Sequence, residues 1–249
     1  MGNRWLISPD KQVDRCKAAV ILFHHAGGAA SAYAGFRHLL PPDIRLWLVQ
    51  LPGRESHRQG NLCCDGNEAA RQILVAIEHE ADARLPLVFY GHSMGAALAM
   101  QTAALAQHTL NITRVCLSSR RPPHLTAFEQ DLLLATDQQV LEAVMQYGAV
   151  PEMILSDLEM RQSLIDKVRN DYGVARSLHC TRPELLLREV ALSVWGGNND
   201  PGVSLLHLCQ WSGYSRGAFD CVLFPGDHFF LFDAQNKSLI ARKLVQDFI

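Results

Sequence analysis

The sequence predicts a single α/β domain with a mostly parallel central sheet flanked by helices, and three observations lead to this fold class. Short apolar runs alternate with stretches of helical periodicity, which is typical of βαβ units. The runs are continuously apolar, so both faces of the sheet are expected to be covered. The length of 249 residues suits one α/β domain, and no repeat or linker divides residues 1–249.

The first half of the chain carries four of the expected strands, and a helical stretch follows each of the first three. The strands are expected at residues 18–23 (AAVILF), 45–51 (RLWLVQL), 86–90 (PLVFY) and 114–118 (RVCLS). The helices are expected at 31–40, 67–84 and 94–107. This order of elements indicates a parallel sheet, because parallel strands need crossover connections.

The alternation of strands and helices stops between residues 121 and 188. Helical stretches are expected there at 127–135, 137–147 and 156–168, without a convincing strand. The alternation then resumes, with strands at 189–195 and 219–224 and helices at 204–211 and 233–248. Two interpretations stay open for the interruption, which are ordinary packing helices and an inserted helical lid. Because the alternation resumes, we favour a lid inserted at about 121–188.

Charge and cysteine content exclude several function classes. Lys and Arg total 23 against 25 Asp and Glu, so the net charge of −2 indicates neither a nucleic-acid binder nor a polybasic membrane anchor. Seven cysteines without a CxxC pair do not predict a disulfide framework. The uncharged stretch 85–113 holds several polar side chains, which argues against a membrane span. The first residues hold no apolar signal-peptide core, so the cytoplasm is the expected location.

Residues 91–95 (GHSMG) match the G-x-S-x-G pattern of a nucleophile elbow. The motif follows the apolar run 86–90 and precedes an Ala-rich helix, which is the strand–turn–helix setting that it requires. Gly91 and Gly95 remove side chains that would clash at a sharp turn. The turn presents Ser93 at a helix N-terminus, where N–H groups and the helix dipole favour a developing negative charge. Ser93 is therefore the candidate nucleophile.

A serine hydroxyl is a weak nucleophile, so it needs a base and a group that orients the base. In the fold that carries this elbow, the chain order is Ser, then Asp or Glu, then His. Asp200 lies in a loop after the predicted strand ending VWGG, and His228 lies in a loop after VLF. Asp227 is a rival acid, but neighbouring side chains in an extended loop usually diverge. The sequence thus predicts a Ser93–His228–Asp200 triad on an α/β-hydrolase fold.

The oxyanion of such a reaction needs two preorganised N–H donors. The backbone N–H of Met94, the residue after the nucleophile, is expected to be one of them. The second is expected from the loop after the first strand, residues 25–28 (HAGG), with Ala26 as the candidate. An ordinary tight turn is the alternative explanation for the two glycines of this loop.

Six short segments occur in a fixed order along the chain. They are HHAGGAASAY (24–33), LPGRE (51–55), GHSMGA (91–96), SSRRPP (118–123), GGNNDP (196–201) and PGDHFFL (225–231). In this order they resemble the successive motifs of type II thioesterases, the stand-alone editing enzymes of nonribosomal peptide and polyketide synthesis. The resemblance runs from about residue 18 to the C-terminus. One departure is Asp227, which stands where many members have a second glycine before the histidine.

The resemblance implies hydrolysis of short acyl groups from the phosphopantetheine arm of acyl or peptidyl carrier proteins, which clears misprimed or stalled units. It implies Ser93, Asp200 and His228 as catalytic residues, Met94 and Ala26 as oxyanion donors, and no metal or dissociable cofactor. The residues alone do not separate a thioester from an ester or amide substrate. A small-molecule carboxylesterase and an acyltransferase on the same fold therefore stay open as alternatives.

Basic residues near the active-site entrance are candidate contacts for the carrier, because carrier proteins are typically acidic. The candidates are Arg37, Arg54, Arg58, Arg120 and Arg121. An ordinary solvated surface arginine is the alternative explanation for each of them. A monomer is expected, because no long amphipathic seam stands out in the sequence.

Overall fold

The computed structural model describes residues 5–9, 16–57, 62–81, 84–126, 131–148, 150–178 and 187–248. Within these residues the chain forms a seven-stranded sheet in the order β1-β3-β2-β4-β5-β6-β7. The strands are β1 (Leu6–Ile7), β2 (Ala18–Phe23), β3 (Ile44–Val49), β4 (Leu87–His92), β5 (Ile112–Ser118), β6 (Ala191–Gly197) and β7 (Phe219–Phe224). All neighbours pair in parallel except the edge strand β1, which is antiparallel to β3.

Strand β2 shows why the apolar runs are unbroken. Ala19, Ile21 and Phe23 belong to one hydrophobic cluster, which also contains buried residues of several helices. Its remaining residues, Ala18, Val20 and Leu22, belong to a second cluster. Side chains alternate across a strand, so a strand covered on both faces must be apolar at every position.

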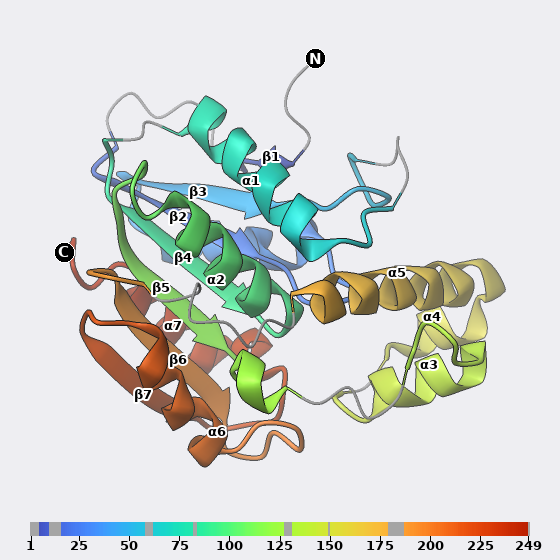
Figure 1. Ribbon diagram of the computed structural model, residues 1–249. Coiled ribbons are helices and arrows are strands. Elements are labelled where there is room, and N and C mark those ends of the chain that lie inside the picture. Colours follow the sequence, from blue (N-terminus) through green and yellow to red (C-terminus); the bar gives the residue numbers. More distant parts are fainter. Residues whose placement is uncertain are drawn as a thin grey trace.

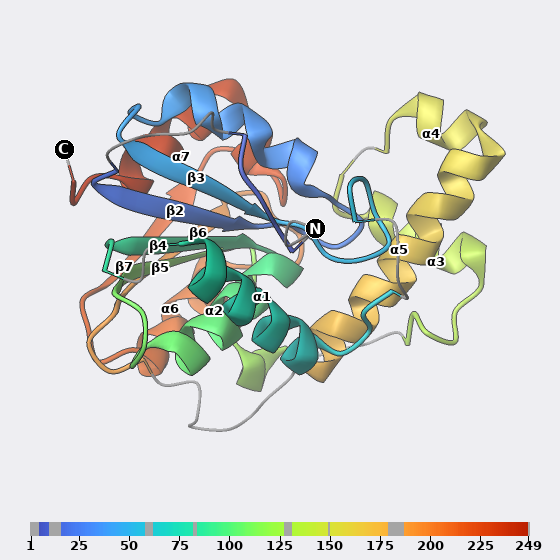
Figure 2. The same cartoon turned by 90° about the horizontal axis from the view of Figure 1, so that it is seen from above.

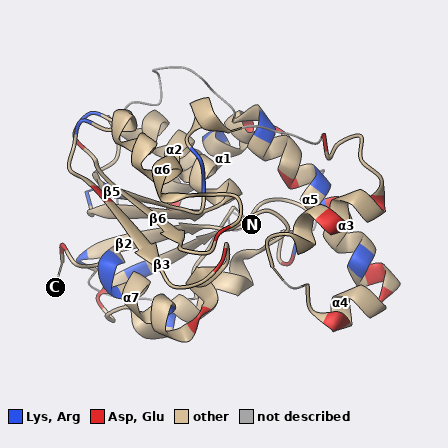
Figure 3. Ribbon diagram, turned by 90° about the horizontal axis from the view of Figure 1, so that it is seen from below, with Lys and Arg blue, Asp and Glu red and all other residues tan. Residues whose placement is uncertain are grey.

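Helices cover both faces of the sheet, as Figures 1 and 2 show. One face packs against α1 (Gly66–Glu80), α2 (Met94–Ala106) and the short pair α6 (Leu205–Cys209) and η4 (Gln210–Tyr214). The other face packs against the 3₁₀ helix η1 (Ala30–Leu39) and α7 (Ala234–Leu244). Most Lys, Arg, Asp and Glu lie on the helices and loops, while the central strands carry few of them (Figure 3).

The segment between β5 and β6 is helical wherever it is regular. It contains η2 (Pro123–Leu125), α3 (Asp137–Met145), α4 (Glu152–Ser156) and α5 (Leu158–Ser177). In Figure 2, α3, α4 and α5 lie beyond the arrowheads of the strands, which is the side where open α/β sheets bind their ligands. That residues 121–188 act as a lid stays a prediction.

The predicted α/β fold with a mostly parallel sheet is confirmed, with three differences in its elements. The helix predicted at 127–135 is wrong for the described residues 131–135, which form a turn and a bend, and 127–130 lie outside the described residues. The helix predicted at 31–40 is a 3₁₀ helix, whose entry residue, Ala29, has no side chain able to cap an α-helix. Strand β1 was not predicted, because two residues carry no periodicity. Among the described residues, no helix is both long enough and apolar enough to cross a bilayer.

Candidate active site

Ser93 occupies a sharp turn between β4 and α2. Its backbone φ is 55° and ψ is −114°, a conformation that L-residues rarely adopt. A Cβ on Gly91 would lie 2.1 Å from the Gly95 carbonyl oxygen, and one on Gly95 would lie 2.2 Å from the Phe23 carbonyl oxygen. Both flanking glycines are therefore required by the close approach of strand and helix. The turn holds Ser93 at the N-terminus of α2, as the sequence predicted.

His228 is held by Asp200, and the two come from loops after neighbouring strands. The ring Nδ1 lies 2.8 Å from Asp200 Oδ2, and the side chain of Asp200 is fully buried. The other carboxylate oxygen accepts the N–H groups of Gly202 at 2.9 Å and Val203 at 3.2 Å. Burial alone would raise the pKa of Asp200, but the hydrogen bond and charge of His228, with the Gly202 N–H, outweigh it and lower the pKa. Asp200 is thus an anion that keeps Nδ1 protonated and leaves Nε2 free to accept a proton.

Asp227, the rival acid, faces a different group. It is exposed, and its Oδ1 accepts the N–H of Phe229 at 2.9 Å within the same turn. Gly226 precedes it with φ at +121°, which turns the chain sharply at this point. No hydrogen bond joins the Asp227 carboxylate to His228 among the described residues. The geometry therefore brings Asp200, and not Asp227, to the histidine ring.

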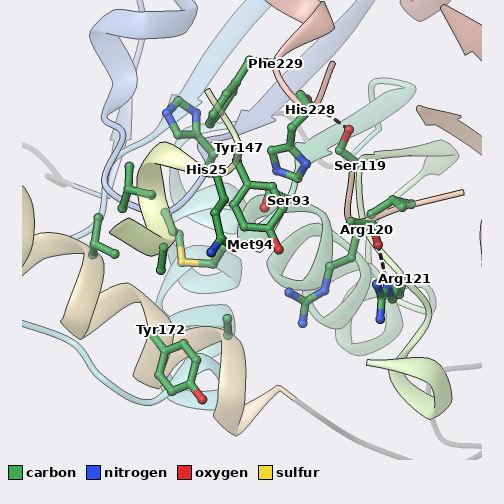
Figure 4. Close-up of a pocket in the computed structure, with 18 of the residues that line it drawn as sticks. His25, Ser93, Met94, Ser119, Arg120, Arg121, Tyr147, Tyr172, His228 and Phe229 are labelled. Atoms are coloured by element: carbon green, nitrogen blue, oxygen red, sulfur yellow. Dashed lines mark hydrogen bonds between the residues drawn. The ribbon is translucent and has the colours of Figure 1, made fainter. Parts of the chain in front are cut away.

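A cavity of about 810 Å³ lies above the elbow, and its lining includes Ser93, His228, Ala26 and Met94 (Figure 4). The Ser93 hydroxyl and the His228 ring are not hydrogen-bonded to each other in the described part of the chain. Such contacts are often long in unliganded enzymes and tighten when substrate binds. The described residues contain no cluster of three or more His, Cys, Asp or Glu that is arranged to hold a metal ion.

The two expected oxyanion donors, Met94 and Ala26, line this cavity. Met94 opens α2, so its N–H is one of the helix's free N-terminal donors. Within the described residues, neither the Met94 N–H nor the Ala26 N–H is hydrogen-bonded to a protein acceptor. Both donors are therefore available to a ligand in the cavity.

The loop that carries Ala26 is fixed by a buried ion pair. Arg54 makes a two-pronged contact with Asp171 of α5, at 2.8 Å and 2.6 Å, and donates to the Gly28 carbonyl at 2.9 Å. Asp171 also accepts the Gly27 N–H at 2.8 Å. Arg54 and Asp171 are 1% and 0% exposed, so the candidate role of Arg54 as a carrier contact is wrong. Its position in the sequence does not reveal a partner 117 residues further along.

Three histidines beside the site are kept neutral by burial. The pKa of His24 is lowered to about 4, first by desolvation and then by the charge of Arg54. Desolvation and the neighbouring His24 lower the pKa of His25 to about 3, and desolvation also lowers that of His92. His25 also lines the cavity.

Tyr147 belongs to the site and was missed by the sequence analysis. Its ring centroid lies 4.7 Å from that of His228, and it comes from the chain just after α3. A Cβ on Gly202 would lie 2.9 Å from the Tyr147 ring, so this glycine leaves room for the tyrosine. No motif surrounds Tyr147, so only the folded structure associates it with His228.

Three of the remaining arginine candidates, all in the described chain, are not ordinary surface side chains. Arg37 donates to the carbonyls of Ile44, Leu40 and Pro41, which accounts for it as a structural residue. Arg120 and Arg121 line the cavity. Arg58 lies outside the described residues.

Comparison with known proteins agrees with this fold. Residues 18–246 match the sequence profile of the thioesterase domain. The chain is 31% identical over 239 residues to the gramicidin S biosynthesis protein GrsT of Aneurinibacillus migulanus, covering 95% of this chain and 91% of GrsT. The type II thioesterase BorB from the borrelidin cluster superposes with a TM-score of 0.84 at 25% identity, covering 98% of this chain and 99% of BorB. The type II thioesterase YbtT from the yersiniabactin pathway gives the same TM-score at 22% identity, with 98% of each chain covered.

Proposed function

Because this chain belongs to the thioesterase family, we propose that it hydrolyses acyl groups from the phosphopantetheine arm of carrier proteins, as an editing enzyme of nonribosomal peptide or polyketide synthesis. Its partners are then the acyl or peptidyl carrier domains of a synthase. The proposal takes the chain to act as a monomer in the cytoplasm. The observation that carries it is that His228, paired with Asp200, lines one cavity together with Ser93 and the two residues whose N–H groups are free.

Acylation is the first half of the reaction. His228 Nε2 takes the Ser93 proton as the serine oxygen attacks the thioester carbonyl. Asp200, anionic because its pKa is lowered, stabilises the imidazolium that forms. The N–H groups of Met94 and Ala26 bind the carbonyl oxygen as it becomes negative. The C–S bond then breaks, the thiol takes a proton from His228, and an acyl-Ser93 ester remains.

Deacylation repeats these roles with water as nucleophile. His228 removes a proton from a water molecule that attacks the acyl-Ser93 carbonyl, and the same N–H pair stabilises the oxyanion. Ser93 leaves with the proton from His228, and the free acid departs. The helical segment at about 121–188 is proposed as the lid over this cavity, under which the arm reaches Ser93.

Ser93→Ala tests the proposal directly. With an acetyl-loaded carrier protein, we expect the variant to lose about 10⁶-fold in kcat, because no other group forms the acyl-enzyme. Binding of the carrier should survive, since the hydroxyl is small and internal. Acid release by Ser93→Ala near the wild-type rate would remove Ser93 as nucleophile.

Rapid cleavage of a p-nitrophenyl ester by wild type, without acid release from the carrier, would favour a carboxylesterase. Transfer of the acyl group to an acceptor other than water would favour an acyltransferase.

A matched pair of substitutions tests the assignment of the acid. Asp200→Asn should lower kcat by about 10⁴-fold, because the amide no longer selects the tautomer with a free Nε2. Asp227→Asn removes an exposed carboxylate that bonds only its own turn, so kcat should change less than about threefold. Both rates are measured as acid release from the same carrier. The opposite ranking would make Asp227 the acid.

A further inference from the structure

The cavity above Ser93 is electropositive in its lining. Among the described residues that line it, two are arginines, Arg120 and Arg121, and none is an Asp or Glu. Asp200 is absent from the lining because it lies buried against His228. Much of the remaining wall is apolar, with Leu132 and Val168 from the segment between β5 and β6. The two positive charges therefore face a space with no protein anion in it.

The two arginines differ in what holds them. The Nε of Arg121 donates to the Gly202 carbonyl at 2.6 Å, which ties this side chain to the wall. The Arg120 guanidinium makes no hydrogen bond or ion pair with any described residue. Figure 4 shows it extended into the cavity, with the Arg121 bond drawn as a dashed line.

The backbone beneath Arg120 is nevertheless fixed. Its carbonyl accepts the Trp211 Nε1–H at 2.8 Å. The preceding residue, Ser119, donates its hydroxyl to the His228 carbonyl at 3.1 Å and its N–H to the Trp195 carbonyl at 2.9 Å. The guanidinium is therefore aimed into the cavity from a rigid base, which is how binding residues are usually positioned.

The Arg120 guanidinium is partly buried and has no anionic partner in the described chain. It carries five N–H donors and no acceptor satisfies them within the described chain. Desolvation lowers the pKa of Arg120 to about 10, which leaves it protonated at neutral pH, and the nearby Tyr147 offsets only part of this. Desolvated charges are stabilised by an opposite charge with good geometry, and a planar guanidinium fits a carboxylate with two parallel bonds.

The location of Arg120 selects which anion of the substrate it meets. Ser119, the residue before Arg120, donates its hydroxyl to the His228 carbonyl at 3.1 Å, and Arg120 lines the same cavity as Ser93 and His228. Arg120 is thus close to the reacting centre. The phosphate of a phosphopantetheine arm is separated from the sulfur by the whole arm, whereas a carboxylate on a short acyl chain is only a few bonds from the thioester carbonyl.

We propose that Arg120 binds a carboxylate at the far end of a short acyl group, so that half-thioesters of dicarboxylic acids, of the malonyl and succinyl type, are substrates of this site. The inference rests on the proposed hydrolysis at Ser93 and adds the class of acyl group that the cavity takes. The chemistry of the reaction is unchanged. Arg120 fixes the distal end of the acyl chain while Met94 and Ala26 hold the carbonyl oxygen.

The test compares acyl groups of equal length that differ only in the terminal charge. The substrates are malonyl and propionyl thioesters, and succinyl and butyryl thioesters, of N-acetylcysteamine, with the rate without enzyme subtracted. For Arg120→Gln, the ratio of kcat/KM for the charged to the neutral acyl group should fall by about ten- to a hundredfold, mainly through KM. Arg120→Lys keeps the charge without the two-pronged geometry and should recover part of the ratio.

Two controls separate the possible failures. Arg216→Gln removes an exposed arginine outside the cavity and should leave the ratio unchanged. Propionyl-pantetheine and propionyl-phosphopantetheine form the second comparison. If Arg120→Gln instead lowers the preference for the phosphorylated arm, Arg120 binds the phosphate and the proposal is wrong. An unchanged ratio with active enzyme also overturns it. If wild type cleaves none of these thioesters or carrier-borne ones, the proposed function itself fails.

Discussion

Arg54 supports the loop of Ala26 and Arg120 lines the cavity of the candidate active site, yet their surroundings are opposite. Arg54 is enclosed behind the loop of Ala26, where Asp171 and the Gly28 carbonyl accept its N–H groups. Arg120 stands at the end of β5 and has no acceptor in the described chain. A paired buried charge stabilises one arrangement of the protein, whereas an unpaired charge is held ready for a ligand. The first fixes the loop of Ala26, and the second is proposed to select the acyl group.

Breaking the paired charge should have the largest effect on stability. Asp171→Asn leaves Arg54 buried without an anion, so the free energy of unfolding should fall by about 3–5 kcal/mol. Urea denaturation measures it, and Asp166→Asn, on the exposed face of the same helix, is the matched control with a change under about 0.5 kcal/mol. A loss below about 1 kcal/mol for Asp171→Asn would contradict the structural role. Adding Arg54→Met should recover part of the loss, because the unpaired charge is then gone.

Lowering the pH should reduce the stability of the folded protein through the buried His24. Its pKa is about 4 in the folded protein, against an unfolded value near 6.5. As the pH falls from 6.5 to 4, the unfolded chain takes up a proton that the folded chain refuses, so stability falls across this window by about 3 kcal/mol and the loss is complete below it. The pH dependence of unfolding should therefore be shallower in His24→Asn than in wild type. It should be unchanged in His38→Asn, which alters an exposed histidine. Equal slopes in wild type and His24→Asn would contradict the buried neutral state.

Removing the unpaired charge should have the smallest effect. Arg120→Gln deletes a partly buried cation without leaving a protein anion unpaired, so the free energy of unfolding should change by less than about 1 kcal/mol in either direction. The same urea measurement as for Asp171→Asn gives a direct contrast. A loss above about 2 kcal/mol would mean that Arg120 has a structural partner, and the distinction between the two arginines would not hold.

The strands and the candidate triad were predictable because their signals are local. The run at 18–23 coincides with β2, since a strand buried on both faces is apolar throughout. Ser93 carries an elbow motif whose two glycines are required by backbone contacts of 2.1 Å and 2.2 Å. Asp200 and His228 follow predicted strands, and the carboxyl ends of parallel strands meet at one edge of the sheet.

What the sequence did not predict depends on contacts between distant segments. Arg54 was interpreted as a surface residue because nothing near it announces Asp171, 117 positions away. Tyr147 follows a short helix without a motif, and its contact with His228 exists only after the segment between β5 and β6 folds over the strand ends. The helix limits in that segment were also inaccurate. α5 extends to Ser177, well past the predicted end at 168. Its mean hydropathy is low and few of its residues are buried, so its apolar pattern gave little indication of where it ends.

The Arg54–Asp171 pair limits which segments can be exchanged between related enzymes. Asp171 belongs to the helical segment between β5 and β6. The groups that it binds, Arg54 and the Gly27 N–H, belong to loops that follow β3 and β2. A chimera that receives this segment from another enzyme keeps the loop of Ala26 in place only if the donor supplies an acid where Asp171 stands. One carboxylate therefore decides which segments between β5 and β6 are interchangeable, whatever the rest of the grafted segment contributes to the cavity.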